Sequence, residues 1–261
     1  MLPALWVSKT GLSAQDMNLT TISNNLANVS TTGFKKDRAE FQDLLYQIRR
    51  QPGGQSSQDS ELPSGLQLGT GVRVTGTQKI FTTGSLQTTE QPLDMAINGR
   101  GFFQVLLPDG TVSYTRDGSF HLSSDGQLVT SNGYALEPAI VVPPETQTFT
   151  VGEDGTVSVT TVGNPQPQII GNLQTADFIN PAGLQAMGSN LFLDTAASDA
   201  PQVSTPGLNG LGTVLQNTLE NSNVSVVEEL VNMITTQRAY EMNSKVISTA
   251  DQMLSFVTQQ L

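Results

Sequence analysis

The chain has 261 residues, enough for one large domain or two modest ones. It carries 12 basic and 23 acidic residues, a net charge of −11, and has no basic stripe to neutralise phosphates, which excludes a nucleic-acid binder. It has no cysteine, which excludes disulfides and thiolate metal sites, and charged residues make up only 13%.

Apolar residues recur at a spacing of seven near the start of the chain: Leu5, Leu12, Leu19 and Leu26. Ile22 follows one member of this series by three positions. The spacing predicts an α-helix with a heptad-like apolar seam. Pro3 suits a first helical turn and Gly33 a C-terminal stop, so we predict a helical segment over residues 1–33.

The next stretch, 34–72, is predicted to be an extended linker or long loop. Its later part, Gln51–Gly71, has few apolar residues and no period. Its first residues include the bases Lys35, Lys36 and Arg38. They indicate either a contact with an acidic neighbouring subunit or a solvated basic turn.

Residues 73–221 are predicted to form an all-β domain. Turn dipeptides such as Asn98-Gly99 and Asp109-Gly110 recur seven to eleven residues apart, and they accept the positive φ of tight hairpins. The runs between and after them predict strands over 102–107, 111–114, 127–130 and 154–159. Between Arg116 and Arg238 the chain has twelve acids and no Lys or Arg, which indicates a solvated acidic face.

The C-terminal segment, 222–261, repeats the pattern of the N-terminal one at greater length. Six apolar or aromatic residues stand seven apart: Val226, Met233, Tyr240, Ile247, Leu254 and Leu261. Leu230 and Val257 occupy alternate positions of the same seam. We predict a long helix from about residue 225 to near the end of the chain.

The predicted fold class is therefore α+β, with terminal helices that form a coiled-coil domain and an all-β middle domain. A narrow apolar seam must be buried, because each covered Leu, Ile or Met contributes roughly 1.5–3 kcal/mol. The seams pair with each other inside one molecule, or they pack against other subunits, and the two arrangements are compatible. The thirteen seam residues named above are the candidate subunit interface.

Catalysis has little support. His121 is the only histidine, so a His-based dyad, triad or multi-histidine metal site needs other residue types to supply the chemistry. Gly99-Arg100-Gly101 lacks the third glycine of a dinucleotide loop. Asp-Gly pairs such as Asp125-Gly126 match turns better than the spacing of a calcium loop. We predict no catalytic, cofactor or metal site, and no enzyme.

Three motifs resemble those of bacterial flagellar rod and hook proteins. The N-terminal motif includes Asn24, Asn25, Ala27, Asn28, Gly33 and Phe34. The middle motif includes Gly99, Gly101, Phe102, Phe103, Arg116, Gly118 and Phe120. The C-terminal motif includes Gln237, Arg238 and Tyr240. Their order, the chain length and the Gln51–Gly71 insert resemble the distal rod subunits of this family.

The resemblance implies a structural subunit that polymerises into a hollow helical tube, a drive shaft that transmits torque to the hook. It implies the following partners: other copies of the chain, proximal rod proteins, the hook protein, the P- and L-ring proteins and the flagellar type III export apparatus. It also implies a place in the basal body, spanning the periplasm, and export without a cleaved signal. The start Met1–Val7 lacks the features of a signal peptide, and no apolar run reaches the roughly 18–20 residues of a membrane span.

Two other functions are weighed against a rod subunit. One is a secreted β-domain binding module attached to the cell wall, with the helices as a stalk. The other is an enzyme acting on cell-wall glycan, because paired carboxylates cannot be recognised from one sequence. Glycan binding by the middle domain alone would favour the first, and turnover lost on changing one acid would favour the second.

Overall fold

The computed structural model describes residues 3–53, 55–57, 60–61 and 63–259. Its contacts divide the chain into two compact units. The helical unit combines Met1–Leu26, Asp37–Gln78 and Ser225–Leu261. The β unit combines Ala27–Lys36 and Lys79–Val224. Helices from both ends of the chain and a β-rich middle confirm the predicted α+β class.

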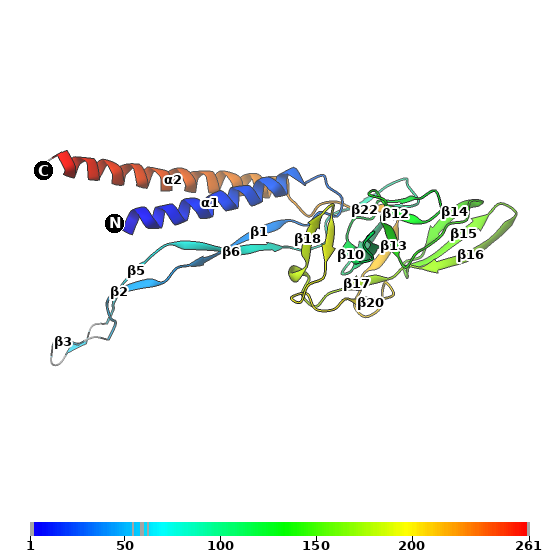
Figure 1. Ribbon diagram of the computed structural model, residues 1–261, viewed down its shortest axis with the longest axis horizontal. Helices are drawn as coiled ribbons and strands as arrows, with labels where there is room; N and C mark the ends of the chain where they lie inside the picture. Colours follow the sequence, from blue (N-terminus) through cyan, green and yellow to red (C-terminus); the bar gives the residue numbers. More distant parts are fainter. Residues whose placement is uncertain (1–2, 54, 58–59, 62, 260–261) are drawn as a thin grey trace. The chain divides into compact units, whose positions relative to one another are not determined.

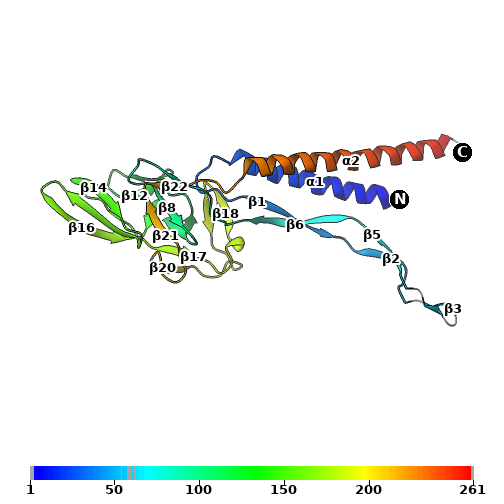
Figure 2. The ribbon, with the colours of Figure 1, turned by 180° about the vertical axis from the view of Figure 1, so that it is seen from behind.

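The helical unit contains both long helices, α1 (Pro3–Ala27) and α2 (Val226–Gln259), which lie side by side in Figures 1 and 2. Helix α1 ends at Ala27, six residues before the predicted stop at Gly33. Asn28 and Thr31 form a turn here, because the Thr31 N–H donates to Asn28 O and the hydroxyl to Asn28 Oδ1. Such side chains compete with helical hydrogen bonds. Neither helix, as far as it is described, is long and apolar enough to cross a membrane.

The described residues of 37–78 form a series of paired strands, although the sequence predicts an extended linker over 34–72. This segment, the β arm, contains β1 (Asp37–Asp43), β2 (Tyr46–Arg50), β3 (Gln55–Ser57), β4 (Ser60–Glu61) and β5 (Leu66–Gly69), and β6 (Val72–Lys79) runs one residue beyond it. The strands pair as β1–β6, β2–β5 and β3–β4, successive ladders of one long hairpin (Figure 1). The described β2 and β5 side chains are all exposed, so no alternation of apolar and polar residues marks these strands.

The β unit contains the remaining strands. They are β7 (Leu86–Thr88), β8 (Met95–Asn98), β9 (Phe102–Leu106), β10 (Val112–Thr115), β11 (Phe120–Leu122), β12 (Leu128–Thr130), β13 (Ala135–Glu137), β14 (Thr146–Val151), β15 (Thr156–Thr161), β16 (Asn164–Asn172), β17 (Thr175–Asp177), β18 (Gln185–Gly188), β19 (Leu191–Leu193), β20 (Gln202–Ser204), β21 (Thr213–Gln216) and β22 (Thr218–Glu220). A short 3-10 helix, η1, spans Pro181–Gly183. The four strands predicted from turn spacing are present as β9, β10, β12 and β15, and His121 lies in β11.

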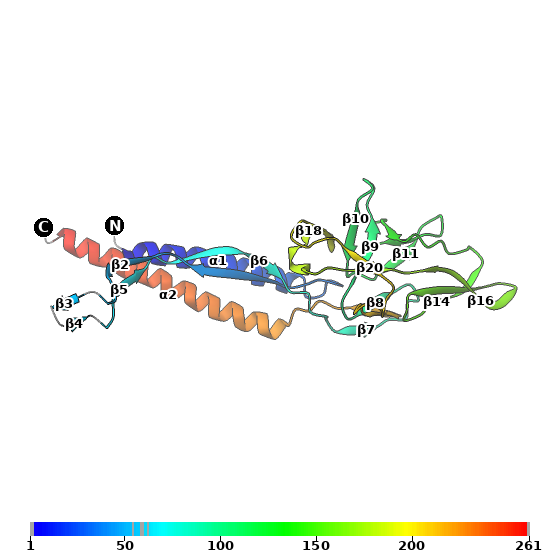
Figure 3. The same ribbon diagram turned by 90° about the horizontal axis from the view of Figure 1, so that it is seen from below.

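The largest sheet of the β unit has the order β11-β12-β13-β9-β10-β19-β18, with β17 paired to β9 and β20 paired to β17. Strands β14-β15-β16 form a separate sheet that extends to one side of it (Figure 3). Strand β8 pairs with β21, and β7 pairs with β22. Residues from near the end of the chain therefore complete ladders that begin in its first hundred residues.

Two cores stabilise the β unit. Met95, Ile97, Phe103 and Val214 belong to a larger aliphatic cluster. The second cluster is aromatic, and Phe102 lies in it with edge-to-face contacts to three other rings. Alternate residues of β9 thus reach different cores, as the period of a strand requires.

Candidate functional site: helix surfaces and a buried ion cluster

Polar and small residues lie where α1 faces α2. The Asn18 side-chain amide donates to Thr236 Oγ1 at 3.0 Å. The Asn25 amide is 3.5 Å from Glu229 Oε2. At Gly11, an added Cβ would be 3.1 Å from the Asn243 amide nitrogen. These positions are seven apart on each helix and run in opposite directions, so the helices are antiparallel.

Burial on the two helices follows the same division. The buried residues of α1 are Ser8, Ala14, Thr21, Ile22 and Asn25, and those of α2 are Glu229, Thr236 and Ala250. Large apolar side chains of α2 point elsewhere; Ile234 is 50% exposed, Met242 64% and Phe256 60%. We call the following set the exposed apolar surface of α2: Val226, Val227, Leu230, Val231, Ile234, Tyr240, Met242, Val246, Met253, Leu254 and Phe256.

The predicted seam residues lie between these two environments. Ile22 is buried, and the half-buried seam residues are Leu5, Leu12, Leu19, Leu26, Met233 and Ile247. The exposed ones are Val226, Leu230, Tyr240 and Leu254. Leu261 and the side chain of Val257 lie outside the described residues. Counting apolar residues at a spacing of seven missed Ile234, Met242, Met253 and Phe256, which lie off the seam.

Asn25 of the N-terminal motif holds three segments of the helical unit together. Its amide donates to Asp37 O at 2.8 Å, and its Oδ1 accepts from the Asp37 N–H at 2.9 Å. The same side chain approaches Glu229 at the start of α2. The neighbouring motif residues Asn24 and Ala27 are exposed. Asn25 therefore fixes the start of β1 to the end of α1.

The β arm contacts α1 at a second place. The Val72 N–H donates to Thr10 Oγ1 at 3.4 Å. Gly71 has a φ of +120°, and a Cβ there would collide with the Thr10 hydroxyl. Further along, β2 and β5 expose Tyr46, Ile48, Leu66 and Leu68, and Leu45, directly before β2, is exposed as well. This part of the arm presents apolar side chains to solvent.

The β unit contains a buried ion cluster formed by Lys35, Arg116 and Glu220. Their exposed fractions are 1%, 3% and 1%. Lys35 Nζ is 2.6 Å from Glu220 Oε1, and Arg116 Nη1 is 3.3 Å from Glu220 Oε2. The Gly84 N–H also donates to Glu220 Oε1, at 2.8 Å. The Glu220 carboxylate thus contacts two cations and accepts from a backbone amide. We call Lys35, Arg116 and Glu220 the Glu220 cluster.

Backbone carbonyls accept further hydrogen bonds from both cations of the cluster, although Arg116 Nε is buried without a hydrogen-bond partner among the described residues. Lys35 Nζ donates to Thr82 O at 2.8 Å. Arg116 donates to Ile97 O at 3.3 Å and to Gly99 O at 2.7 Å, and its guanidinium lies 5.3 Å from the Phe102 ring centre. Buried charges persist when they are paired and hydrogen-bonded in this way. The cluster therefore joins segments from the start, middle and end of the chain.

Burial lowers the pKa of Lys35 below its ordinary value of 10.5, and the Glu220 carboxylate opposes that shift. Burial likewise lowers the pKa of Arg116. Both shifts arise because desolvation disfavours a charged group. Two cations facing one carboxylate leave an excess of positive charge in the cluster.

Several residues of the family motifs meet at the Glu220 cluster. The Gly33 N–H donates to Glu220 O at 2.8 Å. Gly118 lies so close to Met95 O that a Cβ would overlap it. The buried rings of Phe103 and Phe120 belong to the larger core and that of Phe102 to the aromatic core, and Gly101 is buried as well. The C-terminal motif residues Gln237 and Arg238 instead lie exposed on α2.

Sequence reasoning missed the acceptor of this cluster. Glu220 is 185 residues from Lys35 and 104 from Arg116, and no local pattern marks it. Asn223 was missed for the same reason. It accepts from the Lys36 N–H at 2.7 Å and donates to Ile80 O at 2.8 Å. Asn223 therefore also connects the segment around Lys35 to the segment around Glu220.

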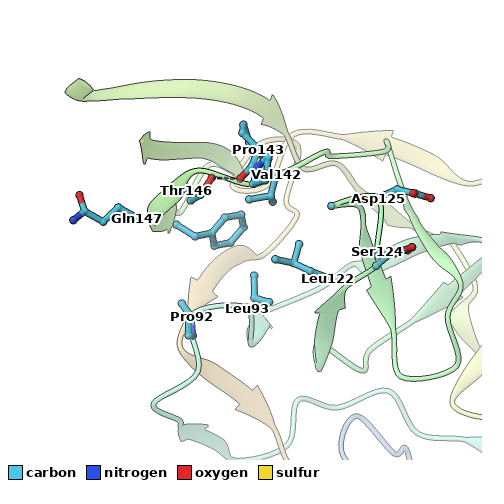
Figure 4. A pocket seen from close by; sticks show the side chains of 13 residues that line it. Pro92, Leu93, Leu122, Ser124, Asp125, Val142, Pro143, Thr146 and Gln147 are labelled. Atoms are coloured by element: carbon cyan, nitrogen blue, oxygen red, sulfur yellow. Dashed lines mark hydrogen bonds between the residues drawn. The ribbon is translucent and has the colours of Figure 1, made fainter. Parts of the chain in front are cut away.

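A cavity of about 540 Å³ opens in the β unit between β11 and β14 (Figure 4). Leu93 and Leu122 point into it, and prolines and Phe149 complete a largely apolar wall. Asp125 is the one carboxylate among its lining residues, and its side chain points away from the cavity. The pair of facing carboxylates that a glycosidase requires is not part of this lining.

Comparisons with known proteins agree with the motifs. Three family profiles match: "Flagella basal body rod protein" over residues 5–35, "Flagellar hook protein FlgE/F/G D1 domain" over 96–159, and "Flagellar basal body rod FlgEFG protein C-terminal" over 215–260. The first matches the segment of α1 and Lys35, the second contains Arg116, and the third contains Glu220 and α2.

Curated relatives are similar over nearly the whole chain. A flagellar basal-body rod protein FlgG of Buchnera aphidicola is 58% identical, covering 99% of this chain and 100% of the relative. FlgG of Caulobacter vibrioides is 48% identical, covering 99% of both chains. FlgG of Bacillus subtilis is 36% identical, covering 97% of both. The chain therefore belongs to the FlgG family of flagellar basal-body rod proteins.

Proposed function

We propose that this chain is a structural subunit of the flagellar distal rod, which polymerises into a hollow helical tube and transmits torque to the hook. The observation that carries the proposal is the exposed apolar surface of α2. Its eleven residues are 36% or more exposed, and covering them would contribute on the order of 10 kcal/mol. Other copies of the chain supply that cover.

The predicted seam residues take part in these contacts, except Ile22, which is already buried within the chain. Those that are half-buried, such as Leu12 and Ile247, become fully covered when neighbouring copies pack against the helix pair. The polar face between α1 and α2 leaves little apolar area for the two helices to bury against each other. Contacts between copies therefore provide most of the stability of the helical unit.

The remaining partners follow from a place in the rod. Proximal rod proteins and the hook protein contact the two ends of the polymer, and the P- and L-ring proteins surround it. The chain reaches the periplasm through the flagellar type III export apparatus, without a cleaved signal. The tube spans the periplasm as part of the basal body.

A structural role is favoured over catalysis. The relatives are named as rod proteins, and the cavity in the β unit contributes one outward-pointing carboxylate. The alternative of a wall-binding module has no support from the comparisons. We therefore expect purified protein to show neither glycan turnover nor glycan binding by the β unit.

The β arm stiffens the tube in this account. A two-stranded hairpin is marginally stable in water, and β2–β5 exposes apolar side chains, with Ile48 at 61%. Contacts with neighbouring copies would cover these side chains and lock the copies together. Deleting Gln55–Ser64 should give more flexible tubes in electron micrographs, whereas tubes as straight and rigid as the parent would contradict this role.

Cysteine accessibility tests the proposed function directly, because the chain has no cysteine of its own. Ile234→Cys and Met242→Cys place single thiols on the exposed apolar surface of α2. Val162→Cys, in the exposed turn after β15, is the control. We expect maleimide to label the α2 thiols in dilute monomer and much less in assembled rods. Equal labelling in both states would refute the proposed contact.

A further inference from the structure

The segment Leu211–Val224, which we call the closing segment, completes the β unit from near the end of the chain. It contains β21, whose Val214 is buried in the larger core, and β22, which pairs with β7. Strand β8 forms a two-stranded ladder with β21. Two buried β8 residues, Met95 and Ile97, belong to the same core as Val214. Without the closing segment, β8 lacks its ladder and part of its cover.

Glu220 gives this segment an electrostatic role as well. Before it arrives, Lys35 and Arg116 have no carboxylate within the cluster, and their burial is opposed by desolvation. Its side chain also accepts from Gly84, and its backbone from Gly33. Burial of the two cations is therefore favourable only with Glu220 in place.

The order of events follows from chain connectivity. The contact between Lys35 and Glu220 spans 185 residues, so its loop-closure entropy is among the largest in the β unit. The β9–β10 hairpin needs only local contacts, but it shares the larger core with β8 and Val214. Local hairpins can form early, while the core stays incomplete until the distant segment docks.

We propose that docking of the closing segment onto Lys35 and Arg116 is the step that completes folding of the β unit, so that a chain lacking its C-terminal part stays open. This goes beyond the rod function, since it concerns a single chain in dilute solution. It also makes the stable β unit conditional on residues that are synthesised late.

The first test follows hydrogen exchange while the full-length chain refolds from urea. We expect full protection of the β9 and β10 amides to develop no earlier than protection of β21 and β22. Full protection of β9 and β10 while β21 and β22 still exchange freely would overturn the proposal. The test uses the unaltered chain, so it is independent of whether any variant folds.

The second test compares full-length variants of the cluster. Glu220→Gln leaves two buried cations without a counter-charge, and we expect the unfolding equilibrium constant to rise by about 100-fold or more. Lys35→Met leaves one cation, Arg116, paired with one carboxylate, Glu220. Thr82 O loses Lys35 as a donor but still accepts from Asn223 at 3.2 Å. This variant should change the unfolding equilibrium constant by about tenfold at most. Glu220→Asp, which keeps the charge, should lie between them.

The comparison remains decisive if Glu220→Gln does not fold. The unfolding equilibrium constants of Lys35→Met and Glu220→Asp can then still be compared with that of the parent. Lys35→Met as damaging as Glu220→Gln would show that packing, and not charge balance, holds the segment. Exchange that increases only around residues 33–36 and 220–223 in a folded Glu220→Gln chain would overturn the role in completing the core.

Discussion

In the β unit, ionised side chains are buried and one of them, Arg116, lies over the ring of Phe102. In the helical unit, by contrast, polar side chains line the inner face and large apolar ones lie outside. The Glu220 cluster is almost fully covered within a single chain, and Ile234 and Met242 are half exposed or more. A unit with its apolar side chains inside can be stable alone. A unit with them outside needs something to cover it, and we propose that neighbouring copies in the polymer provide this cover.

The largest expected effect tests the outer surface of the helical unit. Leu230→Glu with Ile234→Glu would place two charges in an apolar contact between copies, at a cost of several kcal/mol each. We expect loss of tube assembly and of motility, with unchanged thermal unfolding of the β unit. Ser248→Glu, which adds a charge at an exposed polar position of α2, is the control. Tubes formed by the double variant at the same protein concentration as the parent would show that Leu230 and Ile234 do not lie in a contact between copies.

The second prediction concerns the tight fit of the β unit. Gly33 has a φ of +69°, and a Cβ there would lie 2.6 Å from the carbonyl carbon of Arg116. Gly110 has a φ of +83° with nothing within 4 Å of that position. We expect Gly110→Ala to cost about 1 kcal/mol through backbone strain alone. Gly33→Ala should cost about 3 kcal/mol or more, because overpacking adds to the strain. If urea unfolding gives equal losses of unfolding free energy for the two variants, the backbone beside Arg116 shifts readily to accommodate the added Cβ.

The third prediction uses the lowered pKa of Lys35. Between that lowered pKa and the ordinary value of 10.5, the unfolded chain binds the Lys35 proton more than the folded chain does. The free energy of unfolding should therefore rise with pH in this window, by at most about 1.4 kcal/mol per pH unit. The relevant charges facing Lys35 are Glu220 and Arg116.

Urea unfolding of the parent and of Lys35→Met, from neutral pH towards 10.5, measures this contribution. The difference between the two chains removes the titration of other lysines and tyrosines. A difference that is constant with pH would mean that Lys35 stays charged throughout in the folded state.

The smallest effect is expected at the inner face of the helices. Asn18→Ala removes the hydrogen bond to Thr236, worth about 1 kcal/mol. Ser13→Ala, at an exposed position of α1, is the control. Circular dichroism of the dilute monomer should show a slightly lower helix melting temperature for Asn18→Ala only. A loss of several kcal/mol would show that the polar face, and not the outer surface, stabilises the pair.

The elements predicted from the sequence are those with strong local signals. The seven-residue spacing identified α1 and α2, and Asn-Gly and Asp-Gly turns identified β9, β10, β12 and β15. The β arm was missed because the side chains of β2 and β5 are all exposed, so no period of two develops in these strands. The end of α1 was placed too late because Asn28 and Thr31 form a turn before Gly33.

The functional surfaces were predicted less completely. A seam drawn through Leu12 and Tyr240 implies an apolar interface, but the facing side holds Asn18 and Thr236, which the spacing of apolar residues cannot reveal. Family motifs marked Gly33 and Arg116 without explaining them. Their shared partner, Glu220, becomes visible only when the chain folds back over more than one hundred residues.

Hydrogen exchange of the full-length chain, compared between dilute monomer and assembled rods, tests the central claim most directly. We expect the β9 amides to be strongly protected in both states. Amides of α2 around Ile234 and Met242 should exchange readily in the monomer and become protected on assembly. Helix α2 as protected in dilute monomer as β9 would contradict the claim that other copies stabilise the helical unit.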